Sequence, residues 1–260
     1  MSENVIFCYS GTGNCLDLAK NIAAKLKDTD IIMMRSAPVK TDVRDAKRVG
    51  FIFPCYGGGA AGDVLDYVKQ IKVDPMSYTF GIVSCAAYPG TGLADLQKII
   101  PLNYWNVVSH QCSCIWLFPH TLMMPRMNAE EAQVRSERLA AMIADDILAG
   151  ITTKKNPSDN PLNRLEHMGW PLIAKKKAAQ FAVSNACIGC GQCASLCPKN
   201  NIRLENGKPV FGTSCIQCLG CLQYCPQSAI SIGKITDKRE HYHNPNVSAE
   251  ELMKDIIHIA

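Results

Sequence analysis

Eight of the fourteen cysteines lie near the C-terminal end of the chain, in two runs with the same spacing. Each run reads C-x-x-C-x-x-C-x-x-x-C-P; one starts at Cys187 and the other 28 residues later, at Cys215. A C-x-x-C-x-x-C loop supplies three thiolates to an iron–sulfur cubane, and in proteins with two clusters the last cysteine of each run ligates the other cluster. The spacing therefore predicts two [4Fe–4S] clusters. The predicted ligands are Cys187, Cys190, Cys193 and Cys225 for one cluster, and Cys197, Cys215, Cys218 and Cys221 for the other.

Zinc is the main alternative for clustered thiols. A structural zinc site takes four ligands in two pairs, whereas the two runs offer eight cysteines in a different arrangement. Gly189, Gly191 and Gly220 lie between the cysteines, where they would let the backbone approach a cluster closely. Over roughly residues 181–236 the sequence resembles the bacterial-type ferredoxins with two [4Fe–4S] clusters, and it matches their pattern at all eight ligands.

A second candidate site lies near the N-terminus, where residues 10–15 read SGTGNC between an apolar run and a predicted helix. The free N–H groups at a helix N-terminus bind phosphate. A dinucleotide fingerprint needs glycine where this chain has Leu16, and a Walker loop needs Gly-Lys-Ser/Thr, which is absent. We therefore predict a hydroxyl-lined phosphate loop, with an ordinary strand–helix turn as the alternative. The residues of this loop are Ser10, Gly11, Thr12, Gly13, Asn14 and Cys15.

Two further loops follow the third and fourth predicted strands, at the carboxyl edge where doubly wound sheets bind ligands. Each combines a tyrosine with glycines, which suits a planar ring held between backbone and aromatic side chain. The first loop contributes Pro54, Cys55, Tyr56, Gly57 and Gly58, and the second contributes Ser84, Cys85, Ala86, Ala87, Tyr88, Gly90 and Gly92.

Together with the phosphate loop, these loops resemble those of flavodoxin over about residues 1–150. The resemblance implies FMN, with its phosphate in the first loop and its isoalloxazine ring between the other two. One position departs from the pattern, because Cys15 stands where flavodoxins usually keep a hydroxyl. A thiol is the weaker hydrogen-bond donor, so phosphate affinity is the property that this departure affects.

The elements that must position these loops alternate along the first half of the chain. Short apolar runs separated by helical segments predict a parallel sheet covered on both faces. The fold class is therefore α/β, a doubly wound five-stranded parallel sheet of flavodoxin type, joined to a small α+β two-cluster ferredoxin domain. Strands are predicted at 5–9, 30–34, 49–54, 79–85 and 106–117, and helices at 14–27, 62–71, 91–99 and 128–148.

The domain organisation follows from these motifs. We expect a flavodoxin-like FMN-binding domain at 1–150, a basic connector at 151–180, a ferredoxin domain at 181–236 and a tail at 237–260. The connector carries lysines and three prolines, so it is expected to be irregular with one helix near 171–181. In the tail, Ser248 and Glu251 form a capping-box pattern that predicts a helix over 248–259. This layout resembles the flavodoxin–ferredoxin fusion proteins of anaerobic bacteria and archaea.

Composition and charge limit the function classes. With 47% hydrophobic and 19% charged residues the chain is not disordered, and it contains no apolar run long enough to insert in a membrane. The start of the chain lacks a basic leader, and clustered thiols favour a reducing compartment, so we expect a cytoplasmic protein. The formal charge of +4 comes from residues 151–180, and bound clusters and flavin phosphate would change it to about −2. Nucleic acid is therefore not an expected partner.

The resemblance implies FMN and two clusters in one chain but no substrate. We expect an electron-transfer protein whose partners are redox proteins that donate and accept electrons. The alternative is an FMN-dependent reductase of a small molecule or oxidant, fed by the ferredoxin domain, with Tyr56, Tyr88 or His120 as proton donor. A redox sensor is a third possibility. The pair Cys112 and Cys114 is expected to be structural, because two ligands do not make a metal site.

Overall fold

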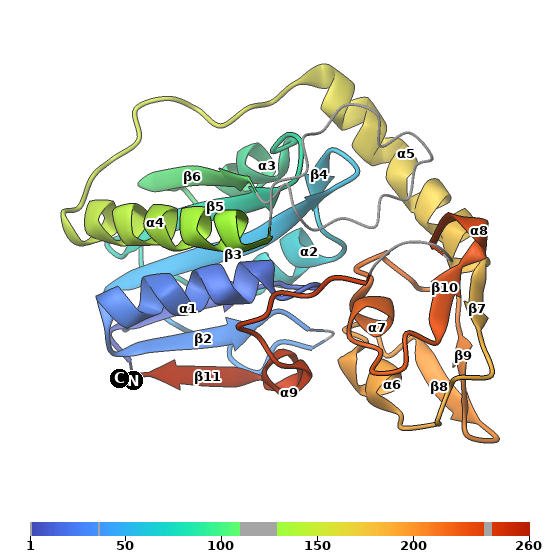
Figure 1. Cartoon of the computed structure of the whole chain (residues 1–260). Helices are drawn as coiled ribbons and strands as arrows, with labels where there is room; N and C mark the ends of the chain where they lie inside the picture. Colours follow the sequence, from blue (N-terminus) through green and yellow to red (C-terminus); the bar gives the residue numbers. More distant parts are fainter. Residues whose placement is uncertain (1, 36, 110–128, 237–240) are drawn as a thin grey trace.

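The computed structural model describes residues 2–35, 37–109, 129–236 and 241–260. A sheet of five parallel strands forms its centre, in the order β2-β1-β3-β5-β6 (Figure 1). The order reverses direction between β1 and β3, which is the arrangement of flavodoxin-like doubly wound folds and confirms the predicted fold class. The strands are β1 (Asn4–Cys8), β2 (Thr29–Met33), β3 (Arg48–Tyr56), β5 (Tyr78–Cys85) and β6 (Tyr104–Ser109).

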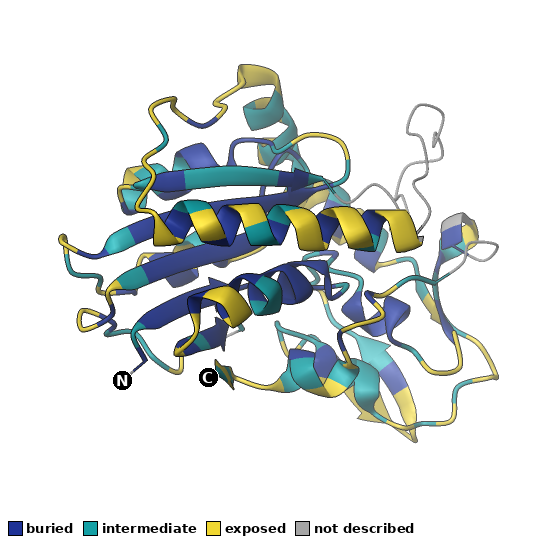
Figure 2. Cartoon of the chain, turned by 60° about the vertical axis from the view of Figure 1, so that its left-hand side comes forward, coloured by how far each residue is buried: buried dark blue, intermediate teal, exposed yellow. Residues whose placement is uncertain are grey.

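Helices cover both faces of this sheet (Figure 2). On one face, α1 (Asn14–Leu26) and α4 (Ala129–Leu148) bury Leu18 and Ile143 with strand residues such as Ile6. On the other face, α2 (Val64–Val68) and α3 (Gly92–Ile99) pack Val64 and Leu96 with Phe7. Strands that are apolar on both faces require this double cover, which explains the near-continuous apolar runs in the sequence.

The C-terminal tail returns to the sheet, which the sequence did not predict. Helix α9 (Ala249–Met253) begins with the expected capping box between Ser248 and Glu251. The chain then becomes extended, and β11 (Ile256–Ile259) pairs antiparallel with β2 at the edge of the sheet. The predicted helix over 248–259 is therefore wrong beyond Met253. Three β-branched isoleucines favour a strand there, and the open edge of β2 satisfies their backbone groups.

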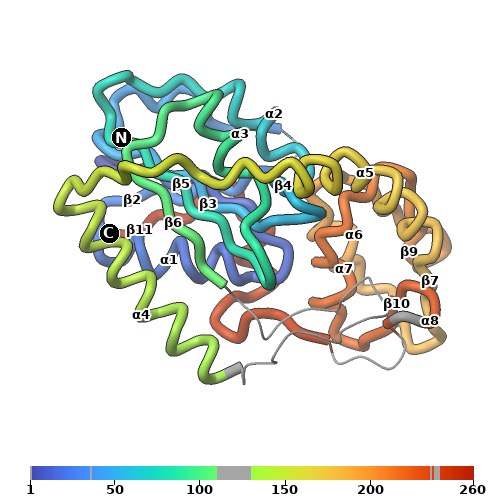
Figure 3. Tube along the Cα trace, turned by 90° about the horizontal axis from the view of Figure 1, so that it is seen from above, coloured from blue at the N-terminus to red at the C-terminus, as the bar shows by residue number. Residues whose placement is uncertain are grey.

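The predicted irregular connector contains a long helix, α5 (Pro161–Ala178). Asn160 caps it by accepting the Leu162 N–H at 2.9 Å, and Pro161 occupies the first turn, where a missing N–H costs nothing. The expected helix near 171–181 thus begins about ten residues earlier and passes through Pro171. Figure 3 shows α5 running from the α3 side of the sheet to the C-terminal module.

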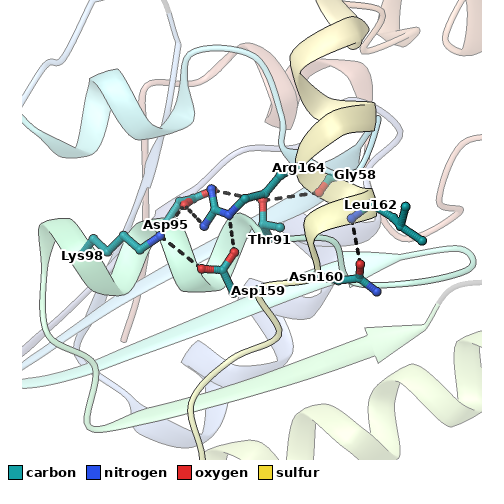
Figure 4. Close-up of polar contacts among 8 residues, drawn as sticks. All are labelled: Gly58, Thr91, Asp95, Lys98, Asp159, Asn160, Leu162 and Arg164. Atoms are coloured by element: carbon teal, nitrogen blue, oxygen red, sulfur yellow. Dashed lines mark hydrogen bonds and ion pairs between the residues drawn. The ribbon is translucent and has the colours of Figure 1, made fainter.

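Polar contacts fasten the first turn of α5 to α3 (Figure 4). The Arg164 guanidinium donates to Asp95 Oδ1 at 2.9 Å and also pairs with Asp159. Thr91 donates its hydroxyl to the other Asp95 oxygen at 3.0 Å, and the Thr91 N–H donates to the Gly58 carbonyl at 2.9 Å. These contacts connect α5 to the loop that follows β3.

The cysteine-rich module is small and built from short elements around Leu222, Ile230 and Ile232. Two antiparallel pairs, β7 with β10 and β8 with β9, flank its helices. Its elements are β7 (Phe181–Val183), α6 (Gln192–Leu196), β8 (Ile202–Glu205), β9 (Lys208–Phe211), α7 (Gly220–Gln223), β10 (Ile230–Ile232) and α8 (Gly233–Thr236). Within the described residues, no helix combines the length and apolar character needed to cross a membrane.

Several predicted features lie outside the described residues. The strand predicted at 106–117 is β6 as far as Ser109, and its remainder is not described. His120, the Cys112 and Cys114 pair, and the start of the helix predicted at 128–148 also lie there.

Candidate functional site

An open cavity lies at the carboxyl edge of the sheet, beside the switch point between β1 and β3. Residues from all three predicted loops line this edge cavity, so strands 1, 3 and 5 bring distant segments together. The predicted residues that line it are Ser10, Gly11, Thr12, Asn14, Cys15, Pro54, Tyr56, Ser84 and Cys85.

The phosphate loop, residues 10–15, leads directly into α1. Gly13 is the N-cap with φ +92°, and no side chain caps the helix there. A side chain at Gly13 would overlap Asn244, so the left-handed turn and the close packing both require glycine. Ser10 Oγ accepts the Leu16 N–H at 3.4 Å. Ser10 thus accepts from one amide of the first turn of α1, and the N–H groups at a helix N-terminus are those that hold an anion.

Cys15 is buried against Ser84 and Cys85 on the wall of the edge cavity. Burial raises the pKa of the Cys15 thiol to about 12, although a hydrogen bond with Ser84 lowers it. The thiol is therefore neutral at physiological pH. A neutral thiol offers a weak donor to the cavity in place of a hydroxyl.

The glycines of the loop after β3 pack against α5 and do not line the edge cavity. Gly57 and Gly58 form the turn between β3 and the short strand β4 (Gly59–Ala60), both with positive φ. The Trp170 ring covers Gly57 so closely that a side chain there would overlap it, and the Tyr88 hydroxyl donates to Glu166 at 2.5 Å. The predicted residues that do not line the cavity are Gly13, Cys55, Gly57, Gly58, Ala86, Ala87, Tyr88, Gly90 and Gly92.

The eight clustered cysteines line two separate cavities, divided as in the predicted ligand sets. We call them the outer cavity and the inner cavity. The outer cavity is lined by Cys187, Cys190, Cys193 and Cys225, and the inner cavity by Cys197, Cys215, Cys218 and Cys221. In the described part of the chain, no three His, Cys, Asp or Glu side chains converge on a single metal ion. A cubane keeps its four ligands farther apart than one ion does.

The two cavities differ in exposure. Cys190 of the outer cavity is exposed, and the neighbouring Ile188 is 65% exposed. Cys218 and Cys221 of the inner cavity are deeply placed, and burial raises the pKa of Cys218 to about 12. Burial also raises the pKa of the Cys221 thiol, and the neighbouring thiols of Cys218 and Cys215 raise it further. Such thiols become thiolates when a metal replaces their protons.

The two cysteine loops have left-handed backbone conformations at the same two positions, but these positions hold glycine only in the first loop. Gly189 and Gly191 have positive φ in the first loop, as the glycine pattern predicts. In the second loop Gln217 (φ +59°) and Leu219 (φ +61°) take the same places. A left-handed conformation costs a residue with a side chain roughly 1–2 kcal/mol. The second loop therefore keeps two side chains in strained positions, and both line the edge cavity.

The inner cavity and the edge cavity meet at Cys218, which lines both. Gln217, Leu219 and Gln223 of the cysteine module complete the wall of the edge cavity. No motif marks these three residues in the sequence, because their role arises only when the module docks on the phosphate loop.

The tail after the cysteine module closes the other side of the phosphate loop. Asn244 is fully buried; its N–H donates to the Thr12 carbonyl at 2.8 Å and its amide donates to Asn14 Oδ1 at 3.2 Å. The Tyr242 hydroxyl donates to the same Asn14 oxygen at 3.0 Å. The phosphate loop is thus held by its own domain, by the cysteine module and by the tail.

Comparison with known protein families identifies the cysteine module. Residues 186–230 match the family of 4Fe-4S dicluster domains. No curated protein matches the chain. The chain therefore joins a flavodoxin-like α/β fold, established by its strand order, to a 4Fe–4S dicluster domain, and the predicted combination is confirmed.

Solved structures of flavoproteins are similar to part of the chain at low identity. Rubredoxin:oxygen oxidoreductase from Desulfovibrio gigas is 14% identical with a TM-score of 0.37, over 56% of this chain and 36% of that protein. The chain thus matches about a third of that protein's length. Fusobacterium nucleatum flavodoxin, solved with flavin mononucleotide, is 12% identical with a TM-score of 0.36, over 56% of this chain and 99% of the flavodoxin. Similarity at this level supports no functional conclusion.

Proposed function

We propose that this protein is an electron-transfer iron–sulfur flavoprotein that links FMN to two [4Fe–4S] clusters within one chain. The observation that carries the proposal is the position of Cys218, which lines both the edge cavity and the inner cavity. A flavin in the one and a cluster in the other would be separated by little more than this residue. The dicluster-domain match supports the iron–sulfur part.

The residues that line the edge cavity suit FMN in their chemistry. The N-terminus of α1 and the hydroxyls of Ser10 and Thr12 suit a phosphate group. Tyr56 and Leu219 line the cavity from opposite modules and supply apolar surface for a planar ring. When bound, FMN takes up two electrons and releases them one at a time, whereas each cluster carries one.

The chain's own residues would keep the two cofactors together. Gly11 lets the Cys218 carbonyl approach the phosphate loop, and Gly220 lies beside the Gly11 carbonyl. Arg35 donates to the carbonyls of Ser195, at 2.8 Å, and Leu252, at 2.9 Å, which ties β2 to the module and to the tail. A tethered pair of cofactors exchanges electrons at a high effective concentration, without waiting for an encounter.

The outer cavity would be the exchange point with partner proteins. Its Cys190 is exposed, and the neighbouring Ile188 offers an apolar contact at the surface. We propose redox proteins as partners, in the cytoplasm, with electrons passing between them and the flavin through the outer and then the inner cluster.

The reductase alternative has less support from the cavity. Of its three candidate proton donors, only Tyr56 lines the edge cavity, because the Tyr88 hydroxyl is bonded to Glu166 of α5 and His120 lies outside the described residues. The edge cavity is open to solvent, and this is the observation that favours a small-molecule substrate.

Anaerobic reductive titration followed by stopped-flow reoxidation tests the proposal. The loaded protein should take up about four electrons per chain, two on FMN and one on each cluster. It should then be reoxidised rapidly by ferredoxin-type proteins and slowly by small molecules. Rapid reoxidation by one class of small molecule, with saturation, would instead support the reductase. An uptake of about two electrons would mean that one cofactor type is missing and would refute the proposal.

A further inference from the structure

Tyr9 lies where the flavodoxin-like half meets the cysteine module, in a cavity that it lines together with Cys218 and Gly220. It follows the last residue of β1 and is only 4% exposed. Its ring packs edge-on against Tyr56, with centroids 6.5 Å apart. Its hydroxyl is buried and, among the described residues, has no hydrogen bond of ordinary geometry. Tyr9 and Cys218 line the same small cavity beside the phosphate loop, so the Cys218 sulfur is a nearby polar atom for this hydroxyl.

Cys218 also lines the inner cavity, so Tyr9 lies beside one of the four cysteines predicted to hold the inner cluster. Tyr9 itself belongs to the flavodoxin-like half of the chain.

An unpaired buried hydroxyl is costly, and a neutral thiol is a weak acceptor for it. A metal-bound thiolate is a strong acceptor, since hydrogen bonds to ionised groups are the shorter and stronger ones. Tyr9 thus offers a donor whose matching acceptor exists only when Cys218 ligates a cluster.

We propose that Tyr9 donates a hydrogen bond to the cluster-bound sulfur of Cys218 and thereby raises the reduction potential of the inner cluster relative to the outer one. Hydrogen bonds to the sulfurs stabilise the more negative, reduced cluster. The donor comes from the flavodoxin-like half, so its effect is confined to the cluster nearest the edge cavity. This inference rests on the proposed function, because it requires both clusters to be present.

The test is an EPR-monitored potentiometric titration of the Tyr9→Phe protein after its iron and sulfide content has been measured. We expect the inner-cluster potential to move in the negative direction, by up to roughly a tenfold change in its reduced-to-oxidised ratio, or about 59 mV for one electron. The outer-cluster potential should stay constant, which provides an internal control. Tyr67→Phe is the matched control: Tyr67 is 5% exposed and also has an unpartnered buried hydroxyl, but it does not line the cavity that Tyr9 shares with Cys218.

A second substitution separates the hydrogen bond from packing. Site-specific 3-fluorotyrosine at position 9 keeps the ring and makes the hydroxyl a stronger donor, so the inner-cluster potential should move in the positive direction. Shifts of opposite sign in the two proteins support the proposal. Unchanged potentials, or equal shifts of both clusters, would overturn it while leaving the proposed function standing. Wild-type protein that binds no iron would instead refute the proposed function.

Discussion

Gly11 of the phosphate loop packs against the backbone carbonyl of Cys218, so closely that a side chain on Gly11 would overlap this oxygen. The same side chain would come within 2.9 Å of the Tyr56 hydroxyl. One glycine therefore sets how near the cysteine module comes to the edge cavity.

Substituting Gly11→Ala should move the module away from the phosphate loop. We expect FMN affinity to fall at least tenfold, or about 1.4 kcal/mol, and flavin–cluster electron transfer to slow, while iron content is retained. Flavin fluorescence titration and stopped-flow spectroscopy measure these effects. Gly169→Ala in α5 is the control, because nothing lies within 4 Å of the added methyl group. Unchanged FMN affinity in Gly11→Ala would contradict the close approach.

Cys15 is a second position where the chemistry of the phosphate loop can be changed. Cys15→Ser places a stronger donor on the cavity wall, next to Ser84. One improved hydrogen bond is worth about 1 kcal/mol, so FMN should bind roughly fivefold more tightly. Equilibrium titration of the flavin-free protein measures this change. Cys8→Ser is the control: Cys8 is buried but does not line the edge cavity, so this change should lower stability without changing FMN affinity. Weaker FMN binding in Cys15→Ser would exclude a donor role for Cys15.

The tail should be needed for the phosphate loop. In Asn244→Ala, the hydrogen bond to Asn14 is lost and buried polar groups are left unpaired, which we expect to cost about 1–3 kcal/mol of stability. FMN affinity should fall as well, since Asn14 lines the edge cavity. Denaturant unfolding and flavin titration measure the two effects. Asn246→Ala is the control: Asn246 is exposed and its amide makes one long hydrogen bond, to Asp17 at 3.3 Å, so a small loss of stability and no change in FMN affinity are expected. An Asn244→Ala protein with normal FMN affinity would show that the tail does not shape the site.

The ion pair between Lys20 and Glu251, 2.5 Å, should make attachment of the tail pH-dependent. Partial burial alone would raise the pKa of Glu251, but hydrogen bonds from Lys20 and Ser248 outweigh it and lower the pKa. A lowered folded-state pKa means that the stabilisation is complete above the unfolded value of about 4.3 and is lost as the pH falls through the folded value. Its size is about 1 kcal/mol or less.

The variant Glu251→Gln should therefore be less stable than the wild type at pH 7, and the difference should shrink as the pH falls below about 4. Urea unfolding of both proteins across this range measures it. A difference that stays constant with pH would mean that hydrogen bonding in the cap, rather than the charge of Glu251, holds the tail.

The cysteine pattern and the phosphate loop were predictable because short-range spacing determines them. The run from Cys187 fixes its own loop geometry, and residues 10–15 lie between one strand and one helix. The two elements missed depended on partners distant in sequence. Residues 256–259 become a strand because the edge of β2 lies open to them, and α5 extends through Pro171 because its first turn is capped and fastened to α3.

The same reasoning explains which site residues were missed. Gln217 and Leu219 occupy the positions that hold glycine in the other cysteine loop. A residue with a side chain at such a glycine position is a local sign of backbone strain. The contact of both residues with the edge cavity arises only from docking of the module, as does the cavity that Tyr9 and Cys218 share. Conversely, Tyr88 was predicted beside the flavin but is bonded to Glu166, because α5 was not expected there.

The most direct test of the account is the iron, acid-labile sulfide and flavin content of anaerobically purified protein. The account predicts about eight irons, about eight sulfides and about one FMN per chain. Eight irons without flavin would contradict the assignment of the edge cavity, and zinc in place of iron would contradict the whole account.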